Sequence, residues 1–261
     1  MDKLEGFVNS RLYRIKGFVH PADAILFCRI LQLQAEQGWR GGLAEIGVFY
    51  GRSFALLAHA AKQTGETAIG IDLFDIDGQR QYVDTVLSEE KLSEHTLLRP
   101  MSSADIKPSD VRSAVGPVRF FSVDGGHELH HLENDTVLAQ QSLADHGVIA
   151  FDDFMNAQYP DLSVAVLDFL RRNSETLAPF AISKTKLYVC NISHYDFYRK
   201  AAGNFLLGGG ITQEDVTLLN RQVNFFNQPI ASRFVFQKLA RFGMGNVASR
   251  LTPNRKREFS R

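Results

Sequence analysis

Three aspartates stand directly after two apolar segments, and their positions suggest a cation site. Asp124 follows the segment 118–123, and Asp152 with Asp153 follows the segment 148–151. Short apolar runs of this kind are typical of strands buried on both faces of a parallel sheet. Neighbouring strands would bring the three carboxylates together at the carboxyl edge of the sheet, where ligands bind in such folds. A divalent cation relieves their mutual repulsion, and oxygen ligands suit magnesium, calcium or manganese.

The same segment offers candidates for proton transfer. His127 lies just past the strand end that carries Asp124. Imidazole titrates near neutral pH and can therefore accept a proton there. Our candidates for catalysis are His127 and Asp124. An alternative without chemistry stays open. In that alternative His127 binds a loop backbone or caps the next helix, Asp152 or Asp153 caps a helix, and Asp124 binds a turn amide without any metal.

A second candidate site lies earlier in the chain. Glu45, Gly47 and Gly51 form an E-x-G-x-x-x-G pattern between a predicted strand at 43–46 and a predicted helix at 52–62. Gly47 permits a sharp turn, and Gly51 permits close approach of the backbone to a ligand beside the N–H groups of a helix N-terminus. The two glycines could equally serve close packing of helix on strand.

Asp72 strengthens the ligand interpretation. It ends the next apolar segment, 68–71, where a carboxylate in this kind of fold accepts hydrogen bonds from ribose hydroxyls, although strand-end acids also cap helices. Together the turn and the acid indicate an adenosine-containing cofactor. A dinucleotide fingerprint normally has a third glycine, whereas Phe49 and Tyr50 crowd this loop. The pattern therefore argues against a pyrophosphate and a nicotinamide-dependent dehydrogenase.

Strands and helices alternate around these residues, which predicts an α/β fold: a Rossmann-like, doubly wound, mostly parallel sheet of seven strands with a closing antiparallel hairpin. The strands are expected at 43–46, 68–71, 96–98, 118–123, 148–151, 180–183 and 186–191. Helices are expected from Pro21 to the glycines at 41–42, and at 52–62, 79–92, 109–114, 129–143 and 162–172.

Three parts follow along the chain. Residues 1–40 form a helical lead-in, residues 41–192 the Rossmann-like domain, and residues 193–261 a helical C-terminal extension with a basic tail. We expect the extension to be a lid or a contact in a homo-oligomer, with packing on the core as the simpler alternative. Its aromatic residues include Phe225, Phe226, Phe234, Phe236 and Phe242.

Composition narrows the choice of partner and compartment. The 261 residues contain 29 Lys and Arg against 29 Asp and Glu, so net charge gives no reason to expect nucleic acid or an anionic membrane as partner. Cys28 and Cys190 are far apart, which favours free thiols in a reducing compartment. No signal-like or membrane-spanning run is present. We expect a cytoplasmic protein with a small-molecule substrate.

The cofactor pattern resembles a known family. The segment LAEIGVFYGRS at 43–53, with GIDLFD around Asp72, is similar to the first two motifs of class I S-adenosylmethionine-dependent methyltransferases. The resemblance implies the fold above and S-adenosylmethionine as cofactor. It also implies cofactor contacts: Glu45 with the amino end of methionine, Gly47 and Gly51 in the turn, Ser53 with the carboxylate, Asp72 with the ribose, and Ser102 and Ser103 with the adenine or ribose.

Residues 120–154 resemble a subgroup of that family, the macrocin and cephalosporin-biosynthesis type O-methyltransferases, with a D-G-x-H motif followed by D-D. The resemblance covers roughly 40–192 and implies that Asp124, Asp152 and Asp153 bind Mg²⁺ or another divalent cation. Macrocin-type enzymes have a further carboxylate where this chain has Gly126. That difference puts a sugar substrate and the identity of the base in doubt.

The expected activity is therefore methylation of an oxygen on a small hydroxylated metabolite, of sugar or natural-product type, with help from a divalent cation. A metal-independent O- or N-methyltransferase of the same fold is the first alternative. A nicotinamide-dependent dehydrogenase and a non-catalytic partner protein are the others.

Overall fold

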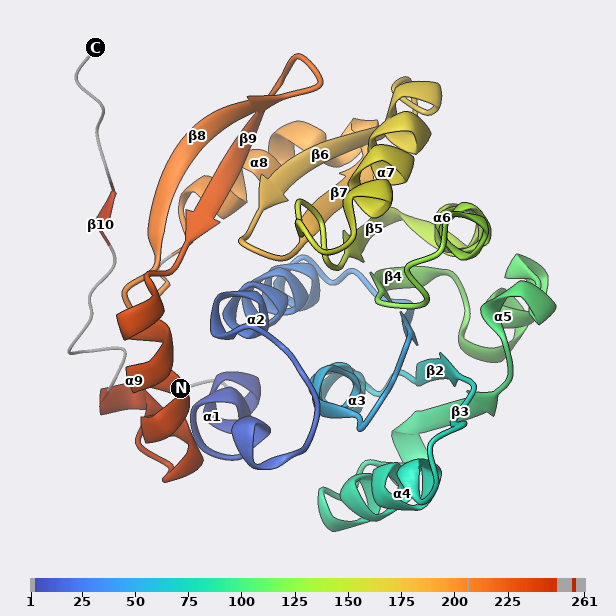
Figure 1. Cartoon of the computed structure of the whole chain (residues 1–261), viewed down its shortest axis with the longest axis vertical. Coiled ribbons are helices and arrows are strands. Elements are labelled where there is room, and N and C mark those ends of the chain that lie inside the picture. The colour runs from blue at the N-terminus through green and yellow to red at the C-terminus, as the bar shows by residue number, and fades with distance from the viewer. Residues whose placement is uncertain (1–2, 206, 248–254, 257–261) are drawn as a thin grey trace.

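The computed structural model describes residues 3–205, 207–247 and 255–256, and one mixed sheet forms its centre (Figure 1). The strand order is β10-β8-β9-β6-β7-β5-β4-β1-β2-β3. Strands β1 to β5 are parallel to one another, and β7 pairs antiparallel with both β5 and β6. The predicted Rossmann-like sheet with its closing hairpin is confirmed. The bounds are β1 (Gly42–Ile46), β2 (Ala68–Asp72), β3 (Thr96–Pro100), β4 (Val118–Val123), β5 (Leu143–Phe151), β6 (Leu177–Ile182) and β7 (Leu187–Asn191).

Helices cover both faces of the sheet, and each face has its own buried core. On one face Phe27 packs edge-on against Phe120, and on the other Phe151 packs edge-on against Phe169. The first core includes α1 (Lys3–Ser10), α2 (Pro21–Glu36), α3 (Arg52–Thr64), α4 (Gln79–Glu89), α8 (Tyr195–Gly203) and α9 (Ile230–Arg241). The second includes α5 (Pro108–Val115), α6 (Leu129–Ser142) and α7 (Pro160–Arg172).

The C-terminal extension is not entirely helical, so that part of the prediction is wrong. Between α8 and α9 the chain forms the hairpin β8 (Thr212–Leu218) and β9 (Arg221–Asn227). Leu219 and Asn220 connect the strands with φ of 50° and 61°, which suits the two-residue turns that match strand twist. Because β9 pairs with β6, the sheet has nine strands of five or more residues instead of seven.

The aromatic residues of the extension are divided between these elements. Phe225 and Phe226 lie on β9, and Phe234 and Phe236 lie on α9. Of the predicted basic tail, only the two residues of β10 (Arg255–Lys256) are described, paired with β8. Arg250, Arg257 and Arg261 fall outside the described residues. Among the helices that are described, none has both the length and the hydropathy needed to cross a membrane.

Candidate active site

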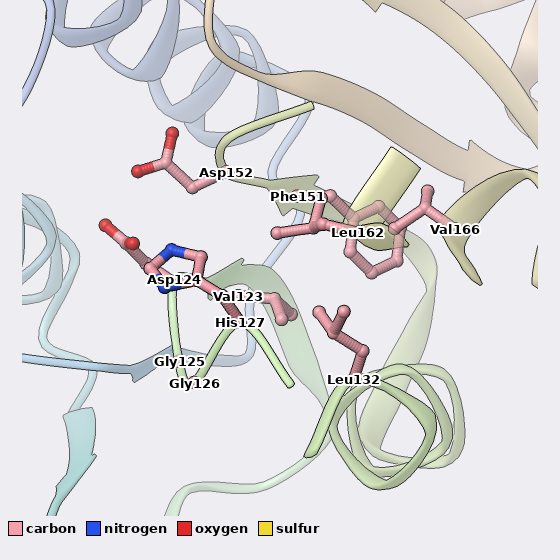
Figure 2. A pocket seen from close by; sticks show the side chains of 10 residues that line it. All are labelled: Val123, Asp124, Gly125, Gly126, His127, Leu132, Phe151, Asp152, Leu162 and Val166. Carbon is pink, nitrogen blue, oxygen red and sulfur yellow. The ribbon is translucent and has the colours of Figure 1, made fainter. Parts of the chain in front are cut away.

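The three predicted metal ligands meet at the carboxyl ends of β4 and β5. Val123 pairs with Phe151 in the sheet, so Asp124 and Asp152 continue side by side from neighbouring strands. One carboxylate oxygen from each of Asp124, Asp152 and Asp153 lies within 4.8 Å of the others. Figure 2 shows Asp124, Asp152 and His127 together at these strand ends. The structure therefore brings the predicted acidic cluster together.

A lysine that the sequence analysis missed completes this cluster. Lys186 Nζ lies 2.8 Å from Asp152 Oδ1 and 3.9 Å from Asp124 Oδ2, and its side chain is only 2% exposed. The residue immediately precedes β7, whose Leu187 pairs with Phe151. The only signal in the sequence is a charged residue at the start of an apolar strand, and its meaning depends on the register of the closing hairpin.

The pKa values of Asp124 and Asp152 shift in opposite directions. Burial raises the pKa of Asp124 well above its usual value, and the carboxylate of Asp152 raises it further. Burial also acts to raise the pKa of Asp152, but the Lys186 ammonium and hydrogen bonds with Asp124 and Lys186 lower it overall. The pKa of Lys186 is raised by Asp152 and Asp124 despite its burial. The cluster thus has an ionised Lys186–Asp152 pair beside an acid that favours its protonated form.

Asp23 connects this cluster to the first turn of α2. Its carboxylate accepts hydrogen bonds from Thr185 Oγ1 at 2.7 Å and from Tyr188 Oη at 2.6 Å. The Asp23 charge also helps to raise the pKa of Lys186. Asp23 falls in the first turn of the helix predicted from Pro21, and nothing local in the sequence indicates that it is fully buried.

His127 lies on the acidic cluster and faces one of the predicted metal ligands. Its Nε2 is 2.9 Å from Asp153 Oδ2, and its ring stacks on Tyr159 with 3.8 Å between ring centroids. Asn156 Nδ2 donates to the other oxygen of Asp153 at 2.9 Å. The imidazole is held in orientation by these contacts.

The glycine turn after β1 has the geometry that the sequence suggested. Gly47 has φ of +82°, and a Cβ added there would stand 1.7 Å from the backbone oxygen of Asp124. Gly51 has φ of +85° and is the N-cap residue of α3. The turn of the cofactor pattern therefore lies directly against the strand end that carries the acidic cluster, and position 47 has no space for a side chain.

Glu45 is fully buried at the end of β1, and neither carboxylate oxygen has a hydrogen-bond partner among the described residues. Burial raises the pKa of Glu45 to about 8, although the nearby hydroxyls of Ser53 and Ser122 and the charge of Lys186 act to lower it. A buried acceptor without a partner is costly. The site is thus suited to a ligand that brings a donor, above all a cationic one.

Asp72, which comes after the glycine turn in the sequence, also contacts this turn in the structure. Its Oδ2 accepts from the Phe49 N–H at 2.8 Å, and its Oδ1 accepts from the Phe74 N–H at 2.7 Å. Each carboxylate oxygen can accept more than one hydrogen bond, so acceptor capacity remains for ribose hydroxyls. Asp72 also holds the loop that contains Phe49 in place.

The two serines after β3 take part in local contacts. Ser102 Oγ accepts from the Ala104 N–H at 3.2 Å, and the hydroxyl of Ser103 lies close enough to Asp135 on α6 to lower its pKa. Burial dominates, however, and raises the pKa of Asp135 to about 6. Contacts of Ser102 and Ser103 with adenine or ribose stay predictions.

Known proteins resemble this chain in domain and fold. The methyltransferase-domain family matches residues 44–154. The apo structure of CalS11, the TDP-rhamnose 3'-O-methyltransferase of calicheamicin biosynthesis, is 16% identical with a TM-score of 0.51 over 65% of this chain and 76% of that chain. The O-methyltransferase NovP is 16% identical with a TM-score of 0.52 over 63% and 78%. Cofactor-bound Rv0187 from MTB is 15% identical with a TM-score of 0.50 over 72% and 88%.

No curated protein matches the sequence significantly. The domain match favours methyl transfer over the hydride transfer that an adenosine-type turn also permits. The matched segment contains the glycine turn, Asp72 and the acidic cluster, so domain and geometry agree on one site. The chain thus contains a methyltransferase domain at residues 44–154 and shares its fold with solved methyltransferases.

Proposed function

We propose that the protein methylates a hydroxyl oxygen of a small metabolite with the help of a divalent cation. The observation that carries this proposal is the cluster of Asp124, Asp152 and Asp153, whose ligand atoms lie within 4.8 Å of one another. The cluster borders the cofactor turn, because Asp124 lies against Gly47. CalS11 and NovP, both described as O-methyltransferases, have the same fold and support oxygen as the acceptor atom.

The cofactor fits the residues of the turn. Glu45, with no partner for either oxygen among the described residues, would receive the ammonium of the methionine part, and Ser53 its carboxylate. Asp72 would accept hydrogen bonds from the ribose. S-Adenosylmethionine supplies an activated methyl group, so the protein has mainly to align the acceptor oxygen with it.

A divalent cation fits the charge of the acidic cluster. With a cation bound, Asp124 would give up its proton, and the three carboxylates with the single ammonium of Lys186 would then carry a formal charge of two negative units. Asp124, Asp152 and Asp153 offer only oxygen ligands, which suit Mg²⁺. When bound there, the cation would supply Lewis acidity towards a hydroxyl of the acceptor.

His127 is the residue that we assign to the acceptor proton. Asp153 holds Nε2 at 2.9 Å and Tyr159 stacks on the ring, so Nδ1 is the nitrogen that can accept a proton. A carboxylate that orients an imidazole in this way also stabilises the imidazolium that forms.

A second candidate needs no metal, and Lys186 is the observation that favours it. The ammonium already contacts Asp152 at 2.8 Å inside the cluster. A buried lysine can offset part of the carboxylate charge. In this case methyl transfer to oxygen or nitrogen would depend on proximity to the cofactor alone.

Calorimetric titration with S-adenosylhomocysteine, with Mg²⁺ and with chelator, tests the proposal. We expect the product to bind in both conditions, Mg²⁺ to bind separately, and Asp153→Asn to lose Mg²⁺ but keep the product. Asp161→Asn, an acid in the first turn of α7, is the control and should keep both. Undiminished Mg²⁺ binding by Asp153→Asn would contradict the metal assignment. No detectable Mg²⁺ binding to the unmodified protein would favour the metal-independent candidate. Failure to bind the product would remove the proposed function itself.

A further inference from the structure

A second group of polar residues lies beside the acidic cluster, where three distant segments meet. A hydrogen bond from Thr185 to Asp23 connects the 183–186 turn to the first turn of α2. α9 packs beside the same N-terminal segment: Tyr13 meets Phe236 edge-on at 6.0 Å, and Arg14 Nε donates to the Arg241 carbonyl at 3.0 Å. Figure 1 shows α9 next to α1 and α2.

His20 is a buried hydrogen-bond donor at this junction. Its Nδ1 accepts from the Ala22 N–H at 3.3 Å as the N-cap of α2, so the neutral ring carries its proton on Nε2. The residue is 8% exposed, and Nε2 has no partner among the described residues. Burial, then Arg233 and Lys184, lower the pKa of His20 to about 4. The ring is therefore a neutral donor with an unused N–H.

The two cations that act on His20 lack an acidic partner. Within the described part of the chain, neither Arg233 nor Lys184 makes a salt bridge. Arg233 Nε is buried and has no hydrogen-bond partner there. Two buried donors without an acceptor, His20 Nε2 and Arg233 Nε, are costly together, and the exposed Lys184 adds a positive charge in the adjoining turn. An oxyanion would satisfy all three, with Arg233 and Lys184 supplying charge-assisted hydrogen bonds.

The junction borders the reaction site. The 183–186 turn connects the two: Thr185 donates at 2.7 Å to Asp23 in the first turn of α2, whose N-cap is His20, and Lys186 Nζ lies 2.8 Å from Asp152 Oδ1. The charge of Asp152 also acts to raise the pKa of His20. A small molecule bound with one group at the acidic cluster could therefore place another group at His20.

The geometry points to an oxyanion subsite for the methyl acceptor, formed by His20, Arg233 and Lys184. The acceptor is then a hydroxylated molecule that also carries a phosphate or carboxylate group. This inference rests on the proposed function for the identity of the bound molecule as acceptor. The subsite itself can be tested without the reaction.

The test uses the full chain in chelator at constant ionic strength, with ¹⁵N-labelled histidine. Inorganic pyrophosphate, inorganic phosphate and malonate are titrated separately while the Nε2 resonance of His20 is followed. We expect at least one anion to shift this resonance with saturation. A preference for the phosphates indicates a phosphate ester on the acceptor, and a preference for malonate indicates a carboxylate.

Two variants and one control locate the binding, and their anion affinities are measured by isothermal titration calorimetry, because His20→Asn has no His20 resonance. Arg233→Gln should weaken anion binding about tenfold, the loss expected for one charge-assisted hydrogen bond. His20→Asn keeps a side-chain acceptor for the Ala22 N–H and removes only the Nε2 donor, and should weaken binding roughly fivefold. Lys238→Gln removes an equal charge from an exposed position of the same helix and should change binding less than about twofold.

Binding of S-adenosylhomocysteine to each variant is measured in parallel. Unchanged product binding shows that the variants are folded. The inference is overturned if no anion shifts the His20 resonance, or if Arg233→Gln and His20→Asn bind anions as well as the unmodified chain does. Loss of product binding in the unmodified chain, with anion binding as expected, would overturn the proposed function and leave the anion subsite standing.

Discussion

The two halves of the sheet's carboxyl edge are built in different ways. The half that we propose for the cofactor, the cofactor half, comes from one continuous strand–helix–strand unit, with Glu45, Gly47 and Asp72 close together in sequence. The half that we propose for the methyl acceptor, the acceptor half, brings together residues far apart in the chain, such as Asp23 and Lys186. Local sequence therefore specifies the cofactor half, whereas the acceptor half depends on how distant segments pack.

The Gly47→Ala substitution should have the largest effect on the cofactor half, because the new Cβ would stand 1.7 Å from the Asp124 backbone oxygen. We expect the free energy of unfolding to fall by at least about 3 kcal/mol and affinity for S-adenosylhomocysteine to fall about 100-fold. Denaturant unfolding and calorimetry measure both. Gly65→Ala is the matched control, with a similar φ of +71° and nothing within 4 Å, and should cost only about 1 kcal/mol. If both substitutions lowered the free energy of unfolding equally, the positive φ alone would explain the loss, and the close approach to Asp124 would not matter.

The Lys186→Met substitution tests the acceptor half. It leaves the buried Asp23 and the half-buried Asp152 without their cation, and removing one partner of a buried ion pair costs about 3–5 kcal/mol. We expect denaturant unfolding at pH 7 to show this loss. Arg171→Met breaks a pair with Asp168 whose side chains are 61% and 50% exposed, and should cost less than about 1 kcal/mol. A loss as small as that of the control would contradict the assigned role of Lys186.

The pH dependence of stability isolates Glu45. Its pKa rises from 4.5 to about 8 on folding, so the folded state holds a proton that the unfolded state releases. The contribution of Glu45 to the free energy of unfolding is complete below pH 4.5. It decreases as the pH rises towards 8, by at most about 1.4 kcal/mol per pH unit. Glu45→Gln should lack this loss, so its free energy of unfolding relative to the unmodified chain should increase from pH 5 to pH 8.5. Parallel pH profiles would exclude a shifted Glu45.

Asp72→Asn should have the smallest effect within the cofactor half. The amide keeps one oxygen for the Phe49 N–H but replaces the acceptor that Phe74 N–H and a ribose hydroxyl would use. We expect about tenfold weaker binding of S-adenosylhomocysteine. Asp84→Asn changes a surface acid paired with Arg80 and should leave affinity unchanged. If Asp72→Asn bound S-adenosylhomocysteine as tightly as the unmodified chain, the proposed contact of Asp72 with the ribose would be contradicted.

Several expectations stay predictions. The cytoplasmic location, the division at residues 40 and 192, and the role of the C-terminal extension as lid or subunit contact have no test in the structure. Phe234 and Phe242 on and after α9 are 62% and 69% exposed. Exposure alone does not identify what covers them.

The sequence by itself determined the parts of the protein that depend on short-range patterns. Apolar runs, glycines and strand-end acids were enough to predict the parallel sheet, the turn at Gly47 and the meeting of Asp124 with Asp152, because parallel strands end at a common edge. The hairpin β8–β9 was predicted wrongly as helix, because β8 begins with four polar residues and lacks the alternation typical of a strand, and its connection at Leu219 and Asn220 has no glycine.

Only the tertiary structure decided the acceptor half. The register of β7 on β5 places Lys186 beside Asp152, and the packing of α9 places Arg233 near His20. Such contacts depend on pairing between segments far apart in the chain, and no local pattern of residue types encodes them. The physical reason is that a buried charge is tolerated only next to its partner, and the partner is chosen by the fold.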